Sequence, residues 1–308
     1  MMVCDVERGA AEEVVGQDAR AVGNVGAVVR SADVDAVVIA TPHAEHFGQA
    51  MVAIAAGKHV LMEKPLGLTM EECEKVVEFA EAAGVTLMAG MTHRFDVRYR
   101  EMRRRLRAGE IGKVTGARAE LGLDVLKYVG REHWVYDGRA GGGARMSLGV
   151  QQIDMLRYLL GQVKGVERAR CEVGHAWFHD GADGRMTATL MMEGGVRAEV
   201  VVSLVDGGRP GELVVVLGEK GEVRIEKQEA SSRKQENSRS MPSGAPAPLG
   251  MAPVADLLSM ARDGDPFVNQ MAEFVRCARS GVEPESSGRD FLETMRVVLG
   301  IGNRAPTT

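Results

Sequence analysis

Two short polar motifs in the first quarter of the sequence stand where chemistry is expected in an α/β protein. Thr41 and Pro42 follow one apolar run of strand length, and Glu63, Lys64 and Pro65 follow the next. Open parallel sheets bind their ligands at the carboxyl ends of the strands. The spacing therefore predicts that both motifs face a ligand crevice.

Lys64 is the residue with the greatest chemical capacity in these motifs. Pro65 fixes the backbone beside it, and an ammonium at a strand end can donate hydrogen bonds to a ribose and to a substrate hydroxyl. If desolvation lowers its pKa, Lys64 can also move a proton. A single Lys is more often a solvated surface charge, and a Thr-Pro pair is often only a strand end, so the residues alone leave these alternatives open.

The elements that must position these motifs lie in the chain up to about residue 115. Short apolar runs alternate there with helical patterns, which is typical of βαβ units around a parallel sheet. Thr69 and Glu72 have the spacing of a capping box at the start of one helix. The predicted strands are 35–41, 59–62 and 85–90. Helical periodicity runs through Gln49, Val52 and Ala56, and further helices are predicted from Thr69 to about Gly84 and from about 97 to 108.

After about residue 112 the pattern changes to successive strands joined by turns, which predicts an open, mainly antiparallel sheet. The predicted strands are 114–121, 166–173, 185–192, 196–204, 212–217 and 222–226, and the predicted helices are 150–160, 266–280 and 290–302. Residues 231–253 are rich in Ser, Pro, Gly and Ala and are predicted to form a mobile loop. The expected fold class is α/β, with a truncated Rossmann-type domain over residues 1–115 and an α+β domain over residues 116–308.

The composition limits the classes of partner. The chain has 308 residues, about two domains' worth. Its 38 Lys and Arg against 43 Asp and Glu give a net charge of −5, so no strong basic field exists to hold a nucleic acid. The arginines between residues 100 and 107 are interpreted as a solvated helix face.

Cysteine usage and hydropathy indicate the compartment. Cys4, Cys73, Cys171 and Cys277 lie too far apart for a zinc site or a disulfide framework, so we expect no metal and reduced thiols. The sequence has no run of about 18 apolar residues, and its start lacks the pattern of a signal peptide. We therefore expect a cytoplasmic protein without a membrane partner.

Several motifs together resemble the Gfo/Idh/MocA oxidoreductases. The most specific is Ala-Gly-Lys-His-Val-Leu-Met-Glu-Lys-Pro at 56–65, which follows Ala-Thr-Pro-His-Ala-Glu-His at 40–46. Further matching segments lie at 90–95, 109–114, 141–154 and 284–290, so the resemblance covers essentially the whole chain. It implies an NAD(P)-binding Rossmann domain and a second domain whose sheet builds homodimers or homotetramers.

The resemblance also implies roles for individual residues, with Lys64 as the catalytic one. The implied cofactor contacts are Thr41, Pro42, His46, Glu63 and Lys64. The implied substrate contacts are Arg94, Ser147, Gln151 and Asp154. Asp5 closes the first visible strand, where an acid accepts hydrogen bonds from the adenosine ribose and slightly favours NAD over NADP. Arg8 weakens that preference, because an Arg can hold a 2′-phosphate.

The sequence departs from the family pattern at its start. A dinucleotide fingerprint needs a strand, a G-x-G-x-x-G turn and a helix, with an acid about 20 residues after the turn, and only four residues precede Asp5. A misplaced gene start or a fragmentary sequence would account for this. We expect two neighbouring strands of the sheet to lack a partner between them. We also expect the chain as given to bind dinucleotide weakly or not at all.

The second departure lies in the segment 143–154. Family members commonly carry Asp-x-Gly-x-His there, and this chain has Ser147, Gly149 and Gln151 at those positions. Gln cannot take up a proton near neutral pH, and Ser does not replace a carboxylate's charge. Lys64 would then be the main proton carrier. The possible helpers, which the sequence does not rank, are His93, His133, Tyr128 and Tyr136.

The favoured function is hydride transfer between a nicotinamide and a sugar, a polyol or a similar hydroxyl or carbonyl substrate. The intact Glu63-Lys64-Pro65 motif supports this function. Ser147 and Gln151 instead favour the alternative, a non-catalytic member of the same fold that senses a sugar or nucleotide and acts in regulation. The family's NAD-dependent glycosidase branch is a third possibility, and no residue selects it.

Overall fold

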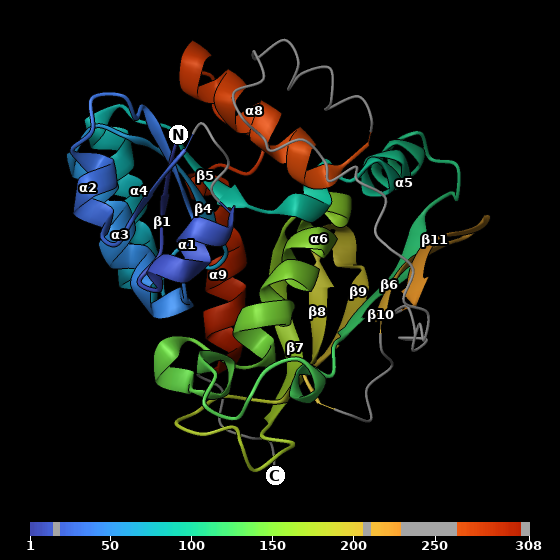
Figure 1. Cartoon of the computed structure of the whole chain (residues 1–308). Coiled ribbons are helices and arrows are strands. Elements are labelled where there is room, and N and C mark those ends of the chain that lie inside the picture. The colour runs from blue at the N-terminus through green and yellow to red at the C-terminus, as the bar shows by residue number, and fades with distance from the viewer. Residues whose placement is uncertain (15–18, 206–210, 229–263, 303–308) are drawn as a thin grey trace, which may run out of the picture.

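Short parallel strands with helices between them build the N-terminal part of the chain (Figure 1). The computed structural model describes residues 1–14, 19–205, 211–228 and 264–302. The elements of this part are β1 (Met2–Cys4), α1 (Arg8–Val14), β2 (Arg20–Val22), α2 (Val25–Val29), β3 (Ala36–Ile39), α3 (His43–Ala55), β4 (His59–Glu63), α4 (Met70–Ala83) and β5 (Leu87–Gly90). Every strand pair among them is parallel, which confirms the predicted Rossmann-type arrangement.

Helix α4 begins where the capping box predicts. Glu72 N donates to Thr69 Oγ1 at 3.1 Å, and Thr69 N donates to Glu72 Oε2 at 3.3 Å. The helix ends at Gly84, whose φ of 67° is left-handed and costs a glycine little. These two ends fix how the chain returns from β4 to β5, the two strands whose carboxyl ends form the cavity described below.

The parallel strands form two separate sheets. β1 pairs with β2, and β3, β4 and β5 form a three-stranded sheet in that order. Among the described residues, β1 and β3 each have a strand partner on one side only, as the sequence predicts. On β3, Val38 is consequently 54% exposed, although its neighbour Ile39 is buried.

The C-terminal part contains a six-stranded sheet in the order β11-β10-β6-β9-β8-β7. Its strands are β6 (Val114–Gly122), β7 (Val163–Glu172), β8 (Arg185–Met192), β9 (Arg197–Ser203), β10 (Gly211–Gly218) and β11 (Gly221–Gln228). All pairs are antiparallel except β6 with β9, which is parallel. The sheet is therefore mainly antiparallel, as predicted.

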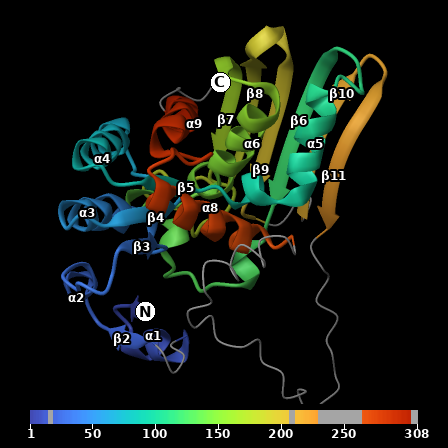
Figure 2. The ribbon, with the colours of Figure 1, turned by 90° about the horizontal axis from the view of Figure 1, so that it is seen from above.

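Helices cover one face of this sheet. They are α5 (Val97–Arg107), α6 (Val150–Leu160) and α9 (Gly288–Gly302), which contact β11, β6 and β7 respectively (Figure 2). Helix α8 (Pro266–Ser280) lies beside the short helix η1 (Thr92–Phe95), and the π-helical turn η5 (Arg145–Gly149) leads into α6. The other short helical turns are η2 (Val125–Lys127), η3 (Trp134–Tyr136), η4 (Gly138–Ala140) and η6 (Glu193–Gly195).

The opposite face of the sheet carries charged side chains. Along β6, Ala117 and Ala119 are buried, whereas Arg118 between them is exposed. Arg118 forms ion pairs with Glu120 on its own strand and with Glu199 on β9. This alternation is typical of a sheet with one face on the core and one face turned outward.

The end of the chain returns to the N-terminal part. Ala89 N donates to Ser286 O at 2.8 Å, and Ser286 Oγ donates to Ala89 O at 2.8 Å, so the segment before α9 is tied to β5. Helix α9 packs against both α4 and α6. The division at residue 115 stays a prediction, and the structure adds that residues of the last helix contact elements on both sides of it.

Two sequence-based expectations concern the chain's surroundings and its linker. No helix in the described ranges is long and apolar enough to cross a membrane. The predicted mobile loop, 231–253, lies outside the described residues.

Candidate active site

A cavity of about 290 Å³ opens at the carboxyl ends of β4 and β5, where the sequence places its polar motif. Segments far apart in the chain meet there: the two strand ends, η1, the start of α6, the end of β11 and the start of α8. The lining residues are Glu63, Lys64, Gly90, Met91, Thr92, His93, Asp96, Gln151, Lys227, Pro266 and Phe267. The cavity has the size and mixed lining of a small-molecule site.

Lys64 lies at the base of this cavity. Its Nζ donates to the main-chain oxygen of Ser147 at 2.7 Å, which ties the end of β4 to η5. Burial lowers the pKa of Lys64, and the neighbouring Glu63 acts in the opposite direction. An ammonium with a lowered pKa can donate a hydrogen bond to a ligand oxygen and exchange a proton with it.

The side chains of His93 and Gln151 both line the cavity, and they contact each other. The Gln151 Nε2 atom lies 2.6 Å from His93 Nε2 and 2.9 Å from His93 Nδ1. On its other side His93 Nδ1 lies 3.2 Å from the Glu212 Oε1 atom, and the imidazole stacks on the Tyr99 ring at 5.2 Å between centroids. The structure thus brings one predicted substrate residue, Gln151, and one predicted helper, His93, to the same site.

Glu212, Lys227 and Asp96 are functional candidates that the sequence reasoning missed. Lys227 Nζ lies 3.4 Å from Glu212 Oε2 and 3.5 Å from Asp96 Oδ2, so one cation neutralises two buried carboxylates. Burial raises the Asp96 pKa, but hydrogen bonds from Arg98 outweigh it and hold the pKa at about 2. Glu212 stands at the start of an otherwise apolar strand, and this isolated acid is the signal that could have marked it.

His46 joins the loops that follow β3 and β4. Its Nε2 lies 2.8 Å from the main-chain oxygen of Thr41, and its Nδ1 lies 2.7 Å from that of Pro65. The Thr41 hydroxyl donates to Gln49 Oε1 at 3.0 Å, within α3. Because these groups bond to one another, His46 and Thr41 act here by fixing the shape of the strand ends. Their contact with a cofactor stays a prediction.

Arg94 and Asp154 are not among the residues that line the cavity, and their contact with a substrate stays a prediction. The Arg94 guanidinium binds the Asp154 carboxylate through two hydrogen bonds, and it also reaches Asp290 at 2.7 Å. Arg94 is 4% exposed and Asp154 is fully buried. The two charged groups hydrogen-bond to each other inside the protein, although they are 60 positions apart in the sequence, and these contacts support a structural role.

The other predicted residues are not among those that line the cavity. Asp5 is exposed at the end of β1, where its carboxylate accepts a hydrogen bond from Glu7 N at 2.8 Å. Ser147 meets Lys64 through its main-chain oxygen, and its own buried hydroxyl has no hydrogen-bond partner among the described residues. Three possible helpers, His133, Tyr128 and Tyr136, are absent from the cavity lining in the described part of the chain.

The residues that line the cavity suit the ribose of a dinucleotide cofactor. Lys64 supplies donors and Glu63 supplies an acceptor at a strand end, a combination suited to the hydroxyls of a ribose. The sequence as given contains no G-x-G-x-x-G segment for the pyrophosphate.

The fold and the cavity define a protein of the dinucleotide-binding α/β class, with its ligand site between a Rossmann-type unit and an α+β unit. Two family models match. The first is described as "Oxidoreductase family, NAD-binding Rossmann fold" and covers residues 1–91. The second is the GFO/IDH/MocA C-terminal domain and covers residues 99–224. The chain belongs to the Gfo/Idh/MocA family.

Individual relatives agree with this assignment. The chain is 35% identical over 161 residues to the 1,5-anhydro-D-fructose reductase of Ensifer adhaerens, covering 52% of this chain and 48% of that protein. It is 28% identical over 287 residues to the D-apiose dehydrogenase of Paraburkholderia graminis, covering 89% and 72%. The chain thus spans about half the length of the first of these relatives.

Solved structures of the same architecture support the fold. One is the WlbA dehydrogenase of Bordetella pertussis, in complex with NADH and UDP-GlcNAcA. It matches with a TM-score of 0.76 and 24% identity, over 98% of this chain and 86% of that one.

Proposed function

We propose that this protein is an NAD(P)-dependent oxidoreductase that interconverts a hydroxyl and a carbonyl group of a sugar, a polyol or a similar small molecule. The observation that carries the proposal is the position of Lys64, whose ammonium lines a cavity at the carboxyl end of β4. The relatives named above are a reductase and a dehydrogenase of such compounds.

Lys64, Gln151 and Glu63 would each have a different role in this reaction. With a nicotinamide cofactor bound, the site would have the hydride acceptor or donor that the reaction needs. Lys64 donates a hydrogen bond to the reacting oxygen, and its lowered pKa suits proton exchange there. Gln151, on the facing wall, pairs with a second hydroxyl through its amide. Glu63 accepts hydrogen bonds from the ribose.

The proposal is tested by titrating NADH and NADPH into the protein and following cofactor fluorescence. Wild type is compared with Lys64→Ala and with Lys58→Ala, a matched control whose ammonium also donates to a main-chain oxygen, Ser31 O at 3.0 Å, but lies outside the cavity lining. The same titration is run on a chain extended to the next upstream start, because the sequence predicts that a pyrophosphate loop is needed for tight binding.

We expect binding and turnover of a polyol panel in the extended form, with turnover lost in Lys64→Ala and kept in Lys58→Ala. General acid–base catalysis contributes about 10²–10⁴-fold, so the loss should be of that order. If neither form binds either cofactor, the oxidoreductase function is wrong. The non-catalytic sugar-sensing alternative, which Gln151 in place of an acid–base residue favours, would then be adopted.

We further propose a cytoplasmic homodimer or homotetramer that forms through the outward face of the six-stranded sheet. All four cysteines are free, which supports a reducing compartment. The outward face pairs Arg118 with Glu199, and such mixed charge suits a self-complementary interface. Light scattering that finds a monomer would contradict the assembly.

A further inference from the structure

Glu212 does not line the cavity itself, but it lies beside His93, which does. Its side chain is 5% exposed, and its Oε1 lies 3.2 Å from His93 Nδ1. Gln152 also donates to Glu212 Oε1, at 3.3 Å. A buried carboxylate this close to one ring nitrogen of a histidine favours, through its charge, the tautomer that carries the proton on that nitrogen.

The selected tautomer leaves the second ring nitrogen with a free lone pair. With the proton on Nδ1, beside Glu212, His93 Nε2 becomes an acceptor. The Gln151 amide nitrogen lies 2.6 Å from Nε2 and 2.9 Å from Nδ1, so it contacts both ring nitrogens. A substrate hydroxyl that displaces this amide would find the same lone pair.

We propose that His93 is the group of this site that accepts and returns the substrate's proton, and that Glu212 is the residue that orients it. The proposal rests on the oxidoreductase function proposed above. It moves the acid–base role from Lys64 to a side chain on η1 and leaves Lys64 to donate a hydrogen bond to the reacting oxygen. The family pattern instead carries a histidine at the position of Gln151.

Charged groups from every neighbouring element act on His93. Burial lowers its pKa, Glu212 on β10 raises it, Lys227 on β11 lowers it, Asp96 before α5 raises it, and Lys64 after β4 lowers it. The net effect is a lowered pKa, so the imidazole is neutral and ready to accept a proton near pH 7. Tyr99 of α5 holds the ring by stacking.

Gln151 suits both protonation states of the imidazole. Its amide nitrogen donates to the neutral ring, and after a half-turn about the last side-chain bond its oxygen would accept from the protonated ring. A glutamine at this position therefore supports a proton carrier on the facing wall, although it carries no proton itself.

The proton and the electrons balance. When the alcohol is oxidised, its O–H bond breaks and the proton passes to His93 Nε2. The electron pair left on oxygen forms the carbonyl as the carbon loses a hydride to the bound nicotinamide. Reduction runs in the opposite direction, with the proton returned from His93.

The first test needs no turnover. Histidine ring signals of the protein, which has seven histidines, are followed by NMR across a pH series in wild type, Glu212→Gln and Lys227→Gln. The His93 signal is assigned by its loss in His93→Asn. We expect Glu212→Gln to lower the His93 pKa and Lys227→Gln to raise it, and added myo-inositol to shift the His93 signal. His179, an exposed histidine 2.9 Å from Asp180, is the internal control.

The second test is the pH profile of kcat for polyol oxidation. We expect kcat to rise through the His93 pKa, and the rising limb to move to lower pH in Glu212→Gln. We expect His93→Asn to lose about 10²–10⁴-fold in kcat, and His179→Asn to keep the wild-type value.

Either an unchanged His93 pKa in Glu212→Gln or a wild-type kcat in His93→Asn would overturn the inference. The pH profile is measured on the extended form. If that form turns over no polyol, the proposed function is refuted, and the inference that rests on it is refuted with it.

Discussion

The guanidinium of Arg94 and the carboxylate of Asp154 lie side by side, with Nε 2.7 Å from Oδ2 and Nη2 2.6 Å from Oδ1. Thr294 Oγ1 also donates to Asp154 Oδ1, at 2.8 Å, and Arg94 Nη1 donates to the main-chain oxygen of Glu285 at 2.8 Å. This buried pair therefore joins η1, α6 and α9, three elements that surround the site.

Removing one charge of this pair should destabilise the fold. Asp154→Asn keeps the size of the side chain but removes the fully buried counter-charge of Arg94 and leaves only Asp290, whose side chain is 36% exposed, so we expect the free energy of unfolding to fall by up to about 3–5 kcal/mol. Urea denaturation measures it. The matched control is Glu199→Gln on the outward face of the sheet, where Glu199 pairs with Arg118 and is 54% exposed. There the loss should stay below about 1 kcal/mol. Equal losses would contradict the structural role of Arg94.

The stability of the protein should fall in acid because of His43. Burial and the nearby Lys64 lower the His43 pKa from 6.5 to about 3, even though its Nδ1 bonds to Gly141 O at 2.8 Å. Between these values the unfolded chain binds a proton that the folded chain does not. The contribution of neutral His43 to the free energy of unfolding is therefore fully present above pH 6.5. It is lost as the pH falls toward 3, by at most about 1.4 kcal/mol per pH unit.

The difference between wild type and His43→Asn isolates this contribution. Denaturation curves are measured from pH 4 to pH 8 in both proteins, and the wild type should lose more stability on acidification. Parallel curves would show that His43 is protonated in the folded protein.

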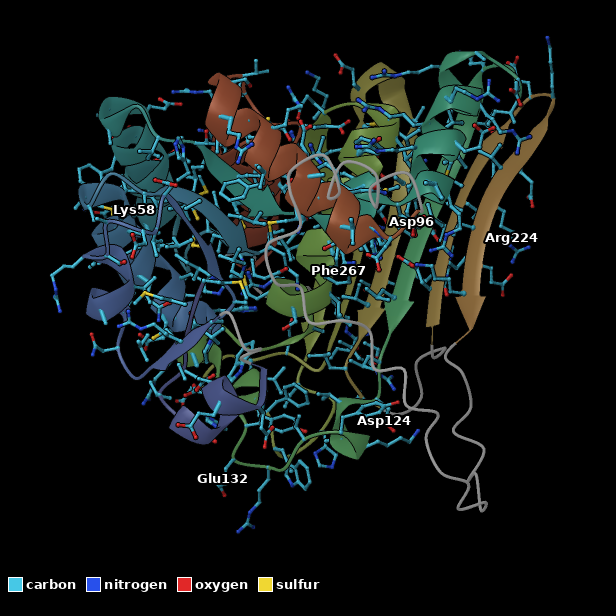
Figure 3. All side chains as sticks on the ribbon, turned by 45° about the horizontal axis from the view of Figure 1, so that its top comes forward. Lys58, Asp96, Asp124, Glu132, Arg224 and Phe267 are labelled. Atoms are coloured by element: carbon cyan, nitrogen blue, oxygen red, sulfur yellow. The ribbon has the colours of Figure 1, made fainter. Side chains whose placement is uncertain are left out.

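Phe267 should contribute to substrate affinity more than to folding. The residue lines the cavity at the start of α8 but is 65% exposed, and Figure 3 shows it near Asp96, another lining residue. Burying about 20–60 Å² of the aromatic ring against the apolar face of a cyclic polyol would contribute about 0.5–1.5 kcal/mol at ~25 cal/mol per Å², so Phe267→Ala should raise KM roughly two- to tenfold. Its effect on the free energy of unfolding should be within about 0.5 kcal/mol.

Steady-state kinetics with a cyclic polyol measure the change in KM. The control is Val282→Ala, which removes an apolar side chain that is 50% exposed and absent from the cavity lining. A KM for Phe267→Ala that matches this control would show that Phe267 does not touch the substrate.

Gly141 should tolerate no side chain. A Cβ there would lie 2.4 Å from Leu68 Cδ2 and 2.8 Å from His43 Cβ, and its φ of 79° is left-handed. Gly109 has a similar φ of 69° but nothing within 4 Å of an added Cβ. Gly109→Ala should therefore cost about 1 kcal/mol from the backbone alone, and Gly141→Ala about 1–3 kcal/mol more. Thermal unfolding of both variants compares them, and equal midpoints would contradict the packing described here.

The longer elements could be predicted closely because their signals are local. Helices α6 and α8 have the predicted bounds: α6 ends before Gly161, and α8 begins with Pro266 in its first turn. Three-residue elements such as β2 and η3 were not predicted, because three residues show no periodicity. The separation of the parallel strands into two sheets was predicted because the sequence as given contains no strand followed by a G-x-G-x-x-G turn.

The site could be predicted only where a motif marks it. Lys64 and Gln151 were found from the family pattern, and the cavity contains both. Glu212, Lys227 and Phe267 were missed because they reach the site only through the pairing of β10 with β6 and β11 and through the placement of α8. Such contacts are set by tertiary structure, which spacing along the chain does not encode.

The tie between Ser286 and Ala89 has a mechanical consequence. The chain passes between the two units once after β5 and again before α9, and both passages lie beside β5. Two neighbouring connections favour a hinge motion, because they permit rotation about the line that joins them and resist rotation about any other axis. If the cavity widens to admit or release a ligand, the movement should be a swing of α8 and the six-stranded sheet away from the strand ends of β4 and β5.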